Sequence, residues 1–262
     1  KNTNENKIMS KGHVRFMAAC LALVCAFYLS FSLVTSHYNK AAKPYFSVLE
    51  YWDGSVSTLQ SRLADAGWNT LTFDFATYYT ALKEGIAVGN YGKCKGAGLP
   101  GAGKSRYACT YVDSHDTFQR GLSTGGDVAG YGSGESVTQA KDKVLACNAY
   151  ILSMPGVPCV FYPHWVTFKD DIKKMINARY KTGVHSESAV SDEAGNGYYK
   201  ATITGTNGEI RLLLGPNSGY NSTPSGYTLA VKGVNWGVYY KTNSARGDKD
   251  QNGDEDAPPI RM

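Results

Sequence analysis

Two short segments of the chain place acidic side chains directly after strand-like runs. Glu50 follows an extended run and is flanked by Tyr51 and Trp52. His115 and Asp116 follow a second run of this kind. In glycoside hydrolysis, a carboxylic acid protonates the leaving oxygen while other carboxylates stabilise positive charge on the sugar ring. These residue types in this setting therefore indicate carbohydrate chemistry.

The two segments differ in what they offer a substrate. Aromatic neighbours that exclude water favour the protonated form of a carboxyl group, so Glu50 is expected to be the proton donor. Asp116 is expected to stay ionised beside His115 in a wetter setting. Neither segment is decisive alone, because a glutamate beside aromatic rings and a His-Asp pair both occur in purely structural roles.

The order and spacing of the two segments resemble two signature regions of the α-amylase family of retaining glycoside hydrolases, family 13. Residues 49–52 are similar to the family's acid region, with Leu49 in place of a glycine. Residues 111–117 are similar to its last catalytic strand, with Ser114 in place of an asparagine. Residues 71–75 and 149–162 also resemble regions of the family. The resemblance is specific because these four regions occur in the same order as in the family.

The resemblance implies an α/β fold, a partial (β/α)8 TIM barrel followed by a small antiparallel β-sandwich. Residues 71–75 resemble the sixth barrel strand, and residues 149–162 resemble a helix and the eighth strand. Residues 36–182 are thus expected to form the C-terminal half of the barrel, apparent strands five to eight. Alternating runs separated by turn residues predict the sandwich over residues 183–243.

What the resemblance implies for function is retaining hydrolysis of α-1,4-glucans such as starch, glycogen and maltooligosaccharides. It assigns Glu50 as general acid/base and Asp116 as the stabiliser of the transition state. It implies that His115 binds a sugar hydroxyl group and that Tyr51 and Trp52 bind the substrate.

His164 lies just after the apparent eighth strand, where the barrel would open onto its active-site face. It is expected either to line a sugar subsite or to pack in the core, and the sequence leaves both roles open. The choice between hydrolysis and transfer to another sugar is open as well.

The catalytic nucleophile of the family has no counterpart in the 262 residues. The nucleophile of the family lies in a Gly-Phe-Arg-x-Asp pattern on the fourth barrel strand, and nothing before Tyr45 resembles it. We therefore expect an incomplete chain that is inactive alone. A noncatalytic glucan-binding or vestigial half-barrel is the alternative. The structural calcium that the family implies would take its ligands mostly from the part with no counterpart, so no metal ligands are assigned.

The first 35 residues are expected to form a separate segment. Residues 16–34 are apolar and uncharged and follow Lys7, Lys11 and Arg15. They fit a signal peptide, an uncleaved anchor, or residues foreign to the enzyme that are joined near Thr35. The abrupt start of the resemblance favours the third origin. A genuine signal or anchor would imply a secreted, periplasmic or cell-surface protein, and only an anchor would bring membrane contact.

Two further motifs suggest other classes of protein. Residues 98–105 match the Gly-x4-Gly-Lys-Ser pattern of a phosphate-binding loop, which requires a strand before it and a helix after it. A polar loop is expected before it and a strand after it, so nucleotide binding is not expected. Residues 248–256 imitate part of an EF-hand, but Pro259 occupies the position of its bidentate glutamate. The stretch 244–262 is interpreted as a solvated acidic tail.

Composition and cysteine content narrow the remaining classes. The chain is 42% hydrophobic and 12% aromatic, and its net charge of +5 is dispersed. Without a basic stripe interleaved with aromatic residues, nucleic-acid binding is not expected. The six cysteines lack zinc-site spacing. Cys94 and Cys109 are expected to be either bridged in an exported protein or free, and the sequence does not decide between the two.

Overall fold

The computed structural model describes residues 46–117 and 140–243. The predicted N-terminal segment 1–35, with its apolar stretch 16–34, lies outside the described residues, and so does the predicted acidic tail 244–262. Within the described ranges, no helix has both the length and the apolar character needed to cross a membrane.

The chain alternates short strands with helical segments and then continues as successive strands. In chain order the elements are β1 (Val48–Leu49), α2 (Val56–Asp65), β2 (Leu71–Phe73), α3 (Phe75–Thr77), the π-helical segment η1 (Tyr78–Lys83), the 3-10 turns η2 (Ile86–Val88) and η3 (Tyr91–Cys94), α4 (Gly98–Gly101), the 3-10 turn η4 (Ser105–Tyr107), β3 (Ala108–Tyr111), α6 (Lys141–Ser153), β4 (Val157–Cys159), α7 (Tyr162–Thr167), α8 (Lys169–Thr182), β5 (Ala189–Gly195), β6 (Tyr198–Thr204), β7 (Gly208–Leu214), the 3-10 turn η6 (Pro216–Ser218), β8 (Thr228–Gly233) and β9 (Trp236–Thr242).

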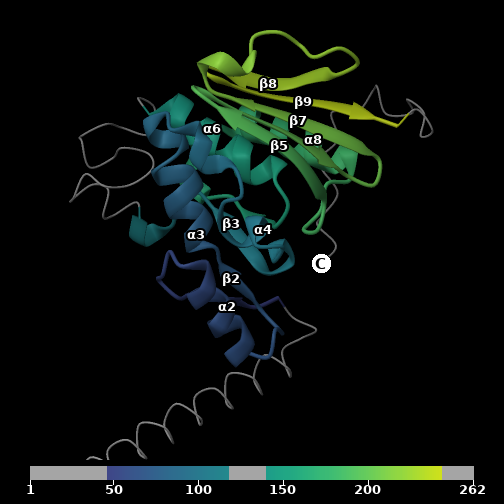
Figure 1. The fold of residues 1–262 in the computed structure, drawn as a ribbon. Helices are drawn as coiled ribbons and strands as arrows, with labels where there is room; N and C mark the ends of the chain where they lie inside the picture. Colours follow the sequence, from purple (N-terminus) through teal and green to yellow (C-terminus); the bar gives the residue numbers. More distant parts are fainter. Residues whose placement is uncertain (1–45, 118–139, 244–262) are drawn as a thin grey trace, which may run out of the picture.

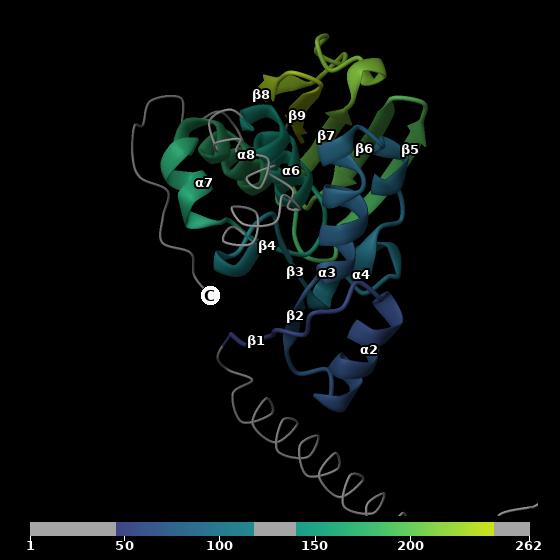
Figure 2. The ribbon, with the colours of Figure 1, turned by 90° about the vertical axis from the view of Figure 1, so that its left-hand side faces the viewer.

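The first four strands form a parallel sheet in the order β1-β2-β3-β4. Each strand pairs with the next one along the chain, and helical segments run between them. Figure 2 shows the four strands side by side. A parallel sheet with helical connections of this kind agrees with the predicted partial barrel. Among the described strands the sheet is open, with β1 and β4 at its edges.

Helix α2 illustrates how local sequence builds this wall. Asp53 Oδ1 accepts a hydrogen bond from the Ser55 backbone N–H at 2.7 Å, and Ser55 Oγ caps the helix by accepting from the Thr58 N–H at 3.3 Å. Leu59 and Leu63, four residues apart on one face, are fully buried. They pack with residues of α3, α4 and β3 in a small separate core.

The last five strands form an antiparallel sheet in the order β5-β6-β7-β9-β8. Helices α6 and α8 pack against β7, β8 and β9, so the sheet lies over these helices as Figure 1 shows. Tyr199, Leu212 and Trp236 of the sheet share one hydrophobic core with α6 and α8. A sandwich was expected here; in the described ranges the antiparallel part is one sheet whose second layer is helical.

Arg179 of α8 ties that helix to the connection between α6 and β4. Its guanidinium donates to the carbonyl oxygens of Leu152 at 2.9 Å, Met154 at 2.8 Å and Gly156 at 2.9 Å. Burial lowers the pKa of Arg179 to about 10. A planar fork of donors can satisfy several carbonyl groups at once, which a lysine cannot do with the same geometry.

The buried Asp74 fastens the loop after η3 to the end of β2. Its carboxylate accepts from the Thr77 N–H at 3.0 Å, from Thr77 Oγ1 at 2.6 Å and from the Leu99 N–H at 3.1 Å. Burial raises the pKa of Asp74, while these hydrogen bonds lower it by a smaller amount. Gly98 makes the close approach possible, because it has a φ of 63° and no side chain.

The phosphate-loop pattern that begins at Gly98 has a different geometry from a nucleotide site. It runs through the single turn of α4 and the 3-10 turn η4 into β3. The Lys104 ammonium lies 5.3 Å from the centre of the Trp68 ring. The pattern therefore leads into a strand, where a phosphate-binding loop would lead into a helix.

We expect Gly98→Ala to lower the free energy of unfolding by about 2–4 kcal/mol, because a Cβ would clash as well as strain the backbone. A Cβ at this position would lie 1.9 Å from Thr77 Oγ1 and 2.7 Å from Asp74 Oδ2. Gly96→Ala is the matched control, since Gly96 has a φ of 67° and open space around it. The control is expected to lose only about 1–2 kcal/mol. Urea titration followed by circular dichroism measures both, and equal losses would contradict the role given to Gly98.

Candidate active site

Polar side chains follow β1 and β3, two strands of the same parallel sheet. Glu50 comes directly after β1, and residues 113–116 come directly after β3. The carboxyl ends of parallel strands meet at one edge of a sheet, where barrel enzymes carry their active sites. The two segments singled out from the sequence thus belong to the same edge.

Glu50 is exposed at the end of β1. Trp52 Nε1 donates a hydrogen bond to Glu50 Oε1 at 3.0 Å. The Tyr51 ring instead faces the Arg62 guanidinium, 5.0 Å from the ring centre. The expected exclusion of water from Glu50 is therefore not seen in the described residues, because Tyr51 and Trp52 are themselves exposed by 39% and 37%.

A row of aromatic rings connects the end of β1 with the end of β3. The Trp52 ring centre lies 4.5 Å from that of Phe75, and Phe75 lies 5.5 Å from Tyr111 in an edge-on contact. Tyr78 stacks on Tyr111 with ring centres 5.2 Å apart. Burial is the main reason that the pKa of the Tyr111 hydroxyl is raised far above its usual value. These rings give the site an apolar floor whose outermost member is Trp52.

His115 and Asp116 emerge where the chain turns into a helix. His115 Nε2 lies 3.6 Å from Asp116 Oδ1, and 77% and 43% of the two side chains are exposed. Ser114 and Thr117 hold this turn by two bonds: the Ser114 N–H donates to Thr117 Oγ1 at 2.7 Å, and the Thr117 N–H donates to Ser114 Oγ at 3.3 Å. The Ser114 that replaces the family's asparagine therefore has a capping role.

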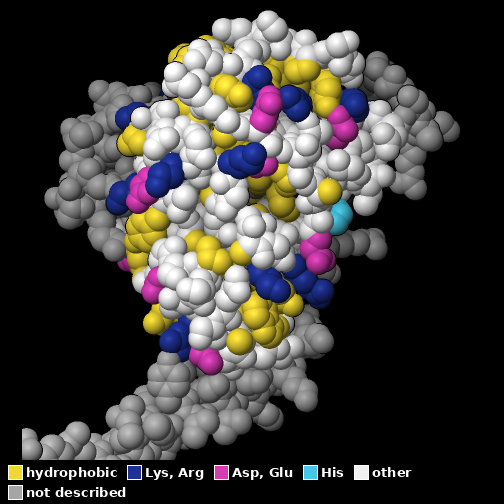
Figure 3. Space-filling view, in the orientation of Figure 1, with side chains coloured by type: hydrophobic (Ala, Val, Ile, Leu, Met, Phe, Trp, Pro, Cys, Tyr) yellow, Lys and Arg dark blue, Asp and Glu magenta, His cyan; other side chains and the backbone are white. Residues whose placement is uncertain are grey.

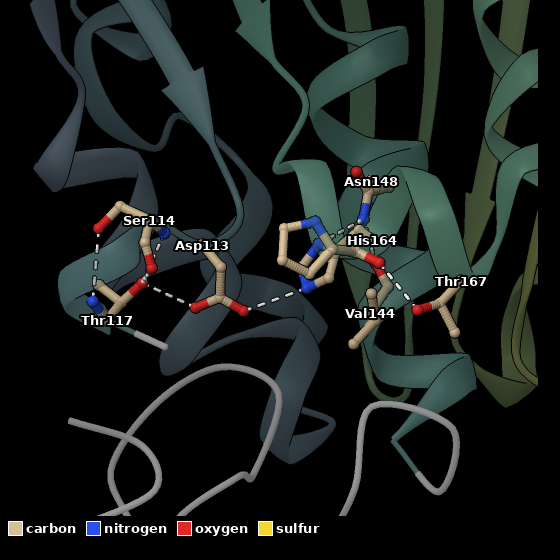
Figure 4. Close-up of polar contacts among 8 residues, drawn as sticks. Asp113, Ser114, Thr117, Val144, Asn148, His164 and Thr167 are labelled. Carbon is tan, nitrogen blue, oxygen red and sulfur yellow. Dashed lines mark hydrogen bonds and ion pairs between the residues drawn. The ribbon is translucent and has the colours of Figure 1, made fainter. Parts of the chain in front are cut away.

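Asp113, the residue before Ser114, is buried against His164 of α7. The imidazole Nε2 lies 3.3 Å from Asp113 Oδ2, and both side chains are fully buried. Thr117 Oγ1 donates to Asp113 Oδ1 at 2.8 Å. On the far side of the ring, Asn148 Nδ2 lies 3.4 Å from His164 Nδ1 and donates to the Val144 carbonyl at 2.8 Å. Figure 4 shows His164 between Asp113 and Asn148.

This arrangement bears on the two roles left open for His164. The imidazole is fully buried among the described residues, which favours the packing role, and the contact with a sugar stays a prediction. Sequence reasoning passed over Asp113 and Asn148. A signal was present for Asp113, because a carboxylate in an otherwise apolar strand end needs a polar partner when it is buried.

No cluster suited to a metal ion is found in the described ranges. Among residues 46–117 and 140–243, no group of three or more histidine, cysteine, aspartate or glutamate side chains is arranged to hold one. The calcium that the resemblance implies therefore stays an expectation, with most of its ligands expected in the part of the family's fold that has no counterpart here. The EF-hand-like stretch 248–256 lies outside the described residues.

Charged side chains of both signs are mixed over the described surface. Figure 3 shows lysine and arginine beside aspartate and glutamate on the face that it presents, with apolar side chains between them. Salt bridges such as Arg62–Asp65 at 2.9 Å and Lys93–Glu84 at 3.3 Å belong to this pattern. Exposed pairs of this kind contribute little to stability.

Known proteins similar to the chain are glucan-active enzymes by name. A probable α-amylase 2 of Arabidopsis thaliana is 32% identical over 233 residues, which are 78% of this chain and 50% of that protein. An α-amylase type B isozyme of Hordeum vulgare is 32% identical over 139 residues, covering 51% of this chain and 80% of that protein. A glucan 1,4-α-maltotetraohydrolase of Stutzerimonas stutzeri is 29% identical over 199 residues, covering 71% and 35%. The chain thus spans half the length of the Arabidopsis relative.

Solved structures with a similar fold include a γ-CGTase and an α-amylase. A γ-CGTase from alkalophilic Bacillus clarkii superposes with a TM-score of 0.56 at 12% identity, over 80% of this chain and 38% of that one. An Anoxybacillus α-amylase superposes with a TM-score of 0.53 at 12% identity, over 81% and 54%. At this identity the likeness shows the fold alone.

No protein-family model matches the chain. The barley isozyme supplies the decisive comparison, because four fifths of that protein is covered at 32% identity. The parallel sheet with acidic residues beyond β1 and β3 agrees with it, as do the superposed structures. The chain belongs to the α-amylase family of glycoside hydrolases.

Proposed function

We propose that this chain carries the acid/base half of a retaining α-glucan hydrolase site. Glu50 is the general acid/base, Asp116 stabilises the transition state, and His115 binds a sugar hydroxyl group. The observation that supports this most is the common edge of the sheet: Glu50 follows β1, and His115 and Asp116 follow β3. The sugar would lie over this edge, with Trp52 at the end of the aromatic row.

The contact between Trp52 and Glu50 suggests which oxygen of the carboxyl group carries the proton. An indole N–H can only donate, so Glu50 Oε1 must act as an acceptor in this pair. The transferable proton would therefore reside on Oε2 and pass from there to the oxygen of the leaving sugar. In the second step the same oxygen would take a proton from water.

Asp116 acts on the sugar ring through its charge. Its carboxylate is half exposed, with His115 as its neighbour, so it can face a bound ring without first leaving a buried site. A negative charge close to a developing oxocarbenium ion is stabilising in the transition state and contributes little in the ground state. The His115 imidazole, exposed beside it, is placed to share a hydroxyl of the same sugar.

The names of the relatives support a proposed substrate class. The proteins from Stutzerimonas stutzeri and Roseateles saccharophilus are named for maltotetraose-releasing action on 1,4-linked glucans. The similar solved structures include a γ-CGTase, whose name does not describe a hydrolase. We propose α-1,4-glucan as substrate and hydrolysis as the reaction, because the names of the curated relatives describe hydrolytic enzymes.

The 262 residues by themselves are proposed not to complete this reaction. Retention requires a nucleophile on the opposite side of the sugar from the acid, and no stretch of the sequence resembles the family's nucleophile region. Residues 36–182 would supply the second half of the barrel, and residues 183–243 the domain that packs against it. The shared core of the two regions supports their folding as one unit.

A noncatalytic glucan-binding half-barrel is the alternative function. Tyr51 and Trp52 favour it, because aromatic faces stack on sugar rings and these two are partly exposed beside Glu50. Binding of this kind needs no nucleophile. It would leave Trp52 in the same place relative to the sugar.

The chain is expected to release no reducing sugar from soluble starch beyond what its Glu50→Gln variant releases. A site with an acid but no nucleophile does not form the glycosyl-enzyme intermediate. A reducing-sugar assay with matched amounts of both proteins measures this. Starch hydrolysis that Glu50→Gln abolishes would show that the nucleophile is present after all.

Trp52→Ala is expected to weaken the binding of maltoheptaose by about tenfold, because the sugar loses its aromatic platform. Tyr180→Ala is the control, since Tyr180 on α8 is 73% exposed and distant in sequence from the candidate site. Calorimetric titration measures the affinities, with circular dichroism to check that each variant keeps its fold. Binding that is absent in the unchanged chain would favour a vestigial half-barrel.

In a chimera that adds the uncovered part of the Arabidopsis relative, Glu50→Gln and Asp116→Asn are expected to differ. Glu50→Gln should slow starch hydrolysis by roughly a hundredfold or more and spare the glycosylation step with an activated aryl glycoside, which leaves without protonation. Asp116→Asn should slow both substrates alike by roughly a hundredfold. Single-turnover kinetics measure the losses. Equal sensitivity of the two substrates to Glu50→Gln would reject the acid role.

A further inference from the structure

A row of buried polar side chains lies beneath the turn that carries His115 and Asp116. Its members come from α6, from α7 and from the residues after β3, and each is buried: Asn148, His164, Asp113 and Thr117. Figure 4 shows them in this order. We call these four residues the polar row.

The Val144 carbonyl oxygen determines how the amide group of Asn148 is turned. Asn148 Nδ2 donates a hydrogen bond to that oxygen at 2.8 Å. A carbonyl oxygen can only accept, so an amide turned the other way would place two oxygen atoms against each other. The same Nδ2 lies 3.4 Å from His164 Nδ1. His164 Nδ1 therefore faces a donor and has to act as an acceptor.

The other ring nitrogen of His164 faces a carboxylate. His164 Nε2 lies 3.3 Å from Asp113 Oδ2, and no other partner of this oxygen is found within residues 46–117 and 140–243. A buried carboxylate oxygen needs a donor, so the proton belongs on Nε2. The neutral imidazole with its proton on Nε2 satisfies both neighbours at once. A second proton, on Nδ1, would point at the amide hydrogen of Asn148.

The Asp113 carboxylate in turn sets the direction of the Thr117 hydroxyl group. Thr117 Oγ1 lies 2.8 Å from Asp113 Oδ1 and 3.3 Å from the Ser114 carbonyl oxygen. Its single proton is drawn to the charged and closer acceptor. The hydroxyl oxygen is then left to accept the Ser114 N–H at 2.7 Å. His115 and Asp116 lie between Ser114 and Thr117, so this bond closes the turn that bears them.

We propose that Asn148 holds His164 as the neutral imidazole with its proton on Nε2. Through Asp113, this form of His164 fixes the turn and so positions Asp116 against the sugar. Asn148 and His164 are positioning residues, because they act on the sugar only through the turn. The part that concerns Asp116 rests on the proposed function, whereas the protonation of His164 and the closure of the turn can be measured without a sugar.

The first test records the imidazole nitrogen signals of the full, isotope-labelled chain by NMR at pH 7. His164 Nε2 should show the chemical shift of a protonated nitrogen and Nδ1 that of an unprotonated one. His164→Gln identifies these signals by their loss. Asn148→Asp replaces the donor by an acceptor and should bring a proton to Nδ1 as well. A protonated Nδ1 in the unchanged chain would overturn the proposal.

The second test follows hydrogen exchange of the Ser114 N–H. His164→Leu cannot donate to Asp113 and should speed this exchange about tenfold or more. His164→Gln keeps an amide donor and should restore most of the protection. The Leu99 N–H, which bonds to Asp74 elsewhere in the fold, is the control and should exchange as before.

Three results of this exchange experiment would reject the positioning role. The Ser114 N–H could exchange at an unchanged rate in His164→Leu. The Leu99 N–H could be accelerated equally, in which case His164 only stabilises the fold as a whole. The glutamine variant could behave like the leucine variant, in which case donation to Asp113 has no part in closing the turn.

The third test uses the chimera with the Arabidopsis relative, where positioning predicts a change in kcat and little change in KM. His164→Leu should lower kcat on starch roughly tenfold or more, and His164→Gln should recover most of that loss. A raised KM with an unchanged kcat would indicate that His164 touches the sugar and would overturn the positioning role. A chimera that is inactive in every form would reject the proposed function, while the first two tests would still decide the state of His164 and of the turn.

Discussion

Helix α6 is buried on every side, and the arrangement of both sheets depends on it. Every residue from Val144 to Ser153 is buried. The helix contacts β3 of the parallel sheet, β7, β8 and β9 of the antiparallel sheet, and α8. A helix that is apolar all round must be enclosed by other elements, and here two sheets and a helix enclose it. The candidate site and the C-terminal sheet are therefore parts of one packed unit.

The Asp113–His164 contact carries this packing to the site. Asp113 follows β3 and precedes the turn with His115 and Asp116, while His164 belongs to α7, just after β4. Removing either partner would leave a polar group buried without its neighbour, which is among the costly changes in a protein core. Asn148 of α6 completes the group from the other side of the imidazole. The turn that bears Asp116 is thus anchored to helix α6 through Asp113, His164 and Asn148.

Aromatic packing connects the end of β1 to the same hydrophobic core. Trp52 rests on Phe75, and Phe75 contacts Tyr111 at the end of β3. A ring packed against a neighbour would lose little further freedom on binding the proposed sugar, because its orientation is already restricted. Glu50, hydrogen-bonded to Trp52, is positioned through this row of rings even though it is exposed.

The sequence alone was sufficient for those features that depend on short segments. The strand-like runs ending in Glu50 and in His115-Asp116 predicted strands and family, and the alternating runs after residue 183 predicted antiparallel strands. Their packing could not be read from the sequence. The antiparallel sheet agrees with the predicted sandwich, but the described sheet also packs on α6 and α8, because which apolar faces meet is decided by the whole set of faces available.

The tertiary structure also decided the roles of individual polar residues. His164 follows a strand end, as a site residue would, but the fold turns it inward to Asp113. The glycine-rich stretch at Gly98 satisfies a nucleotide motif, but its backbone serves the close approach to Asp74 and Thr77. Residue type and spacing determine which chemistry is possible. Burial and the identity of the neighbouring groups determine which of these possibilities each side chain takes, and both come from contacts between residues distant in the sequence.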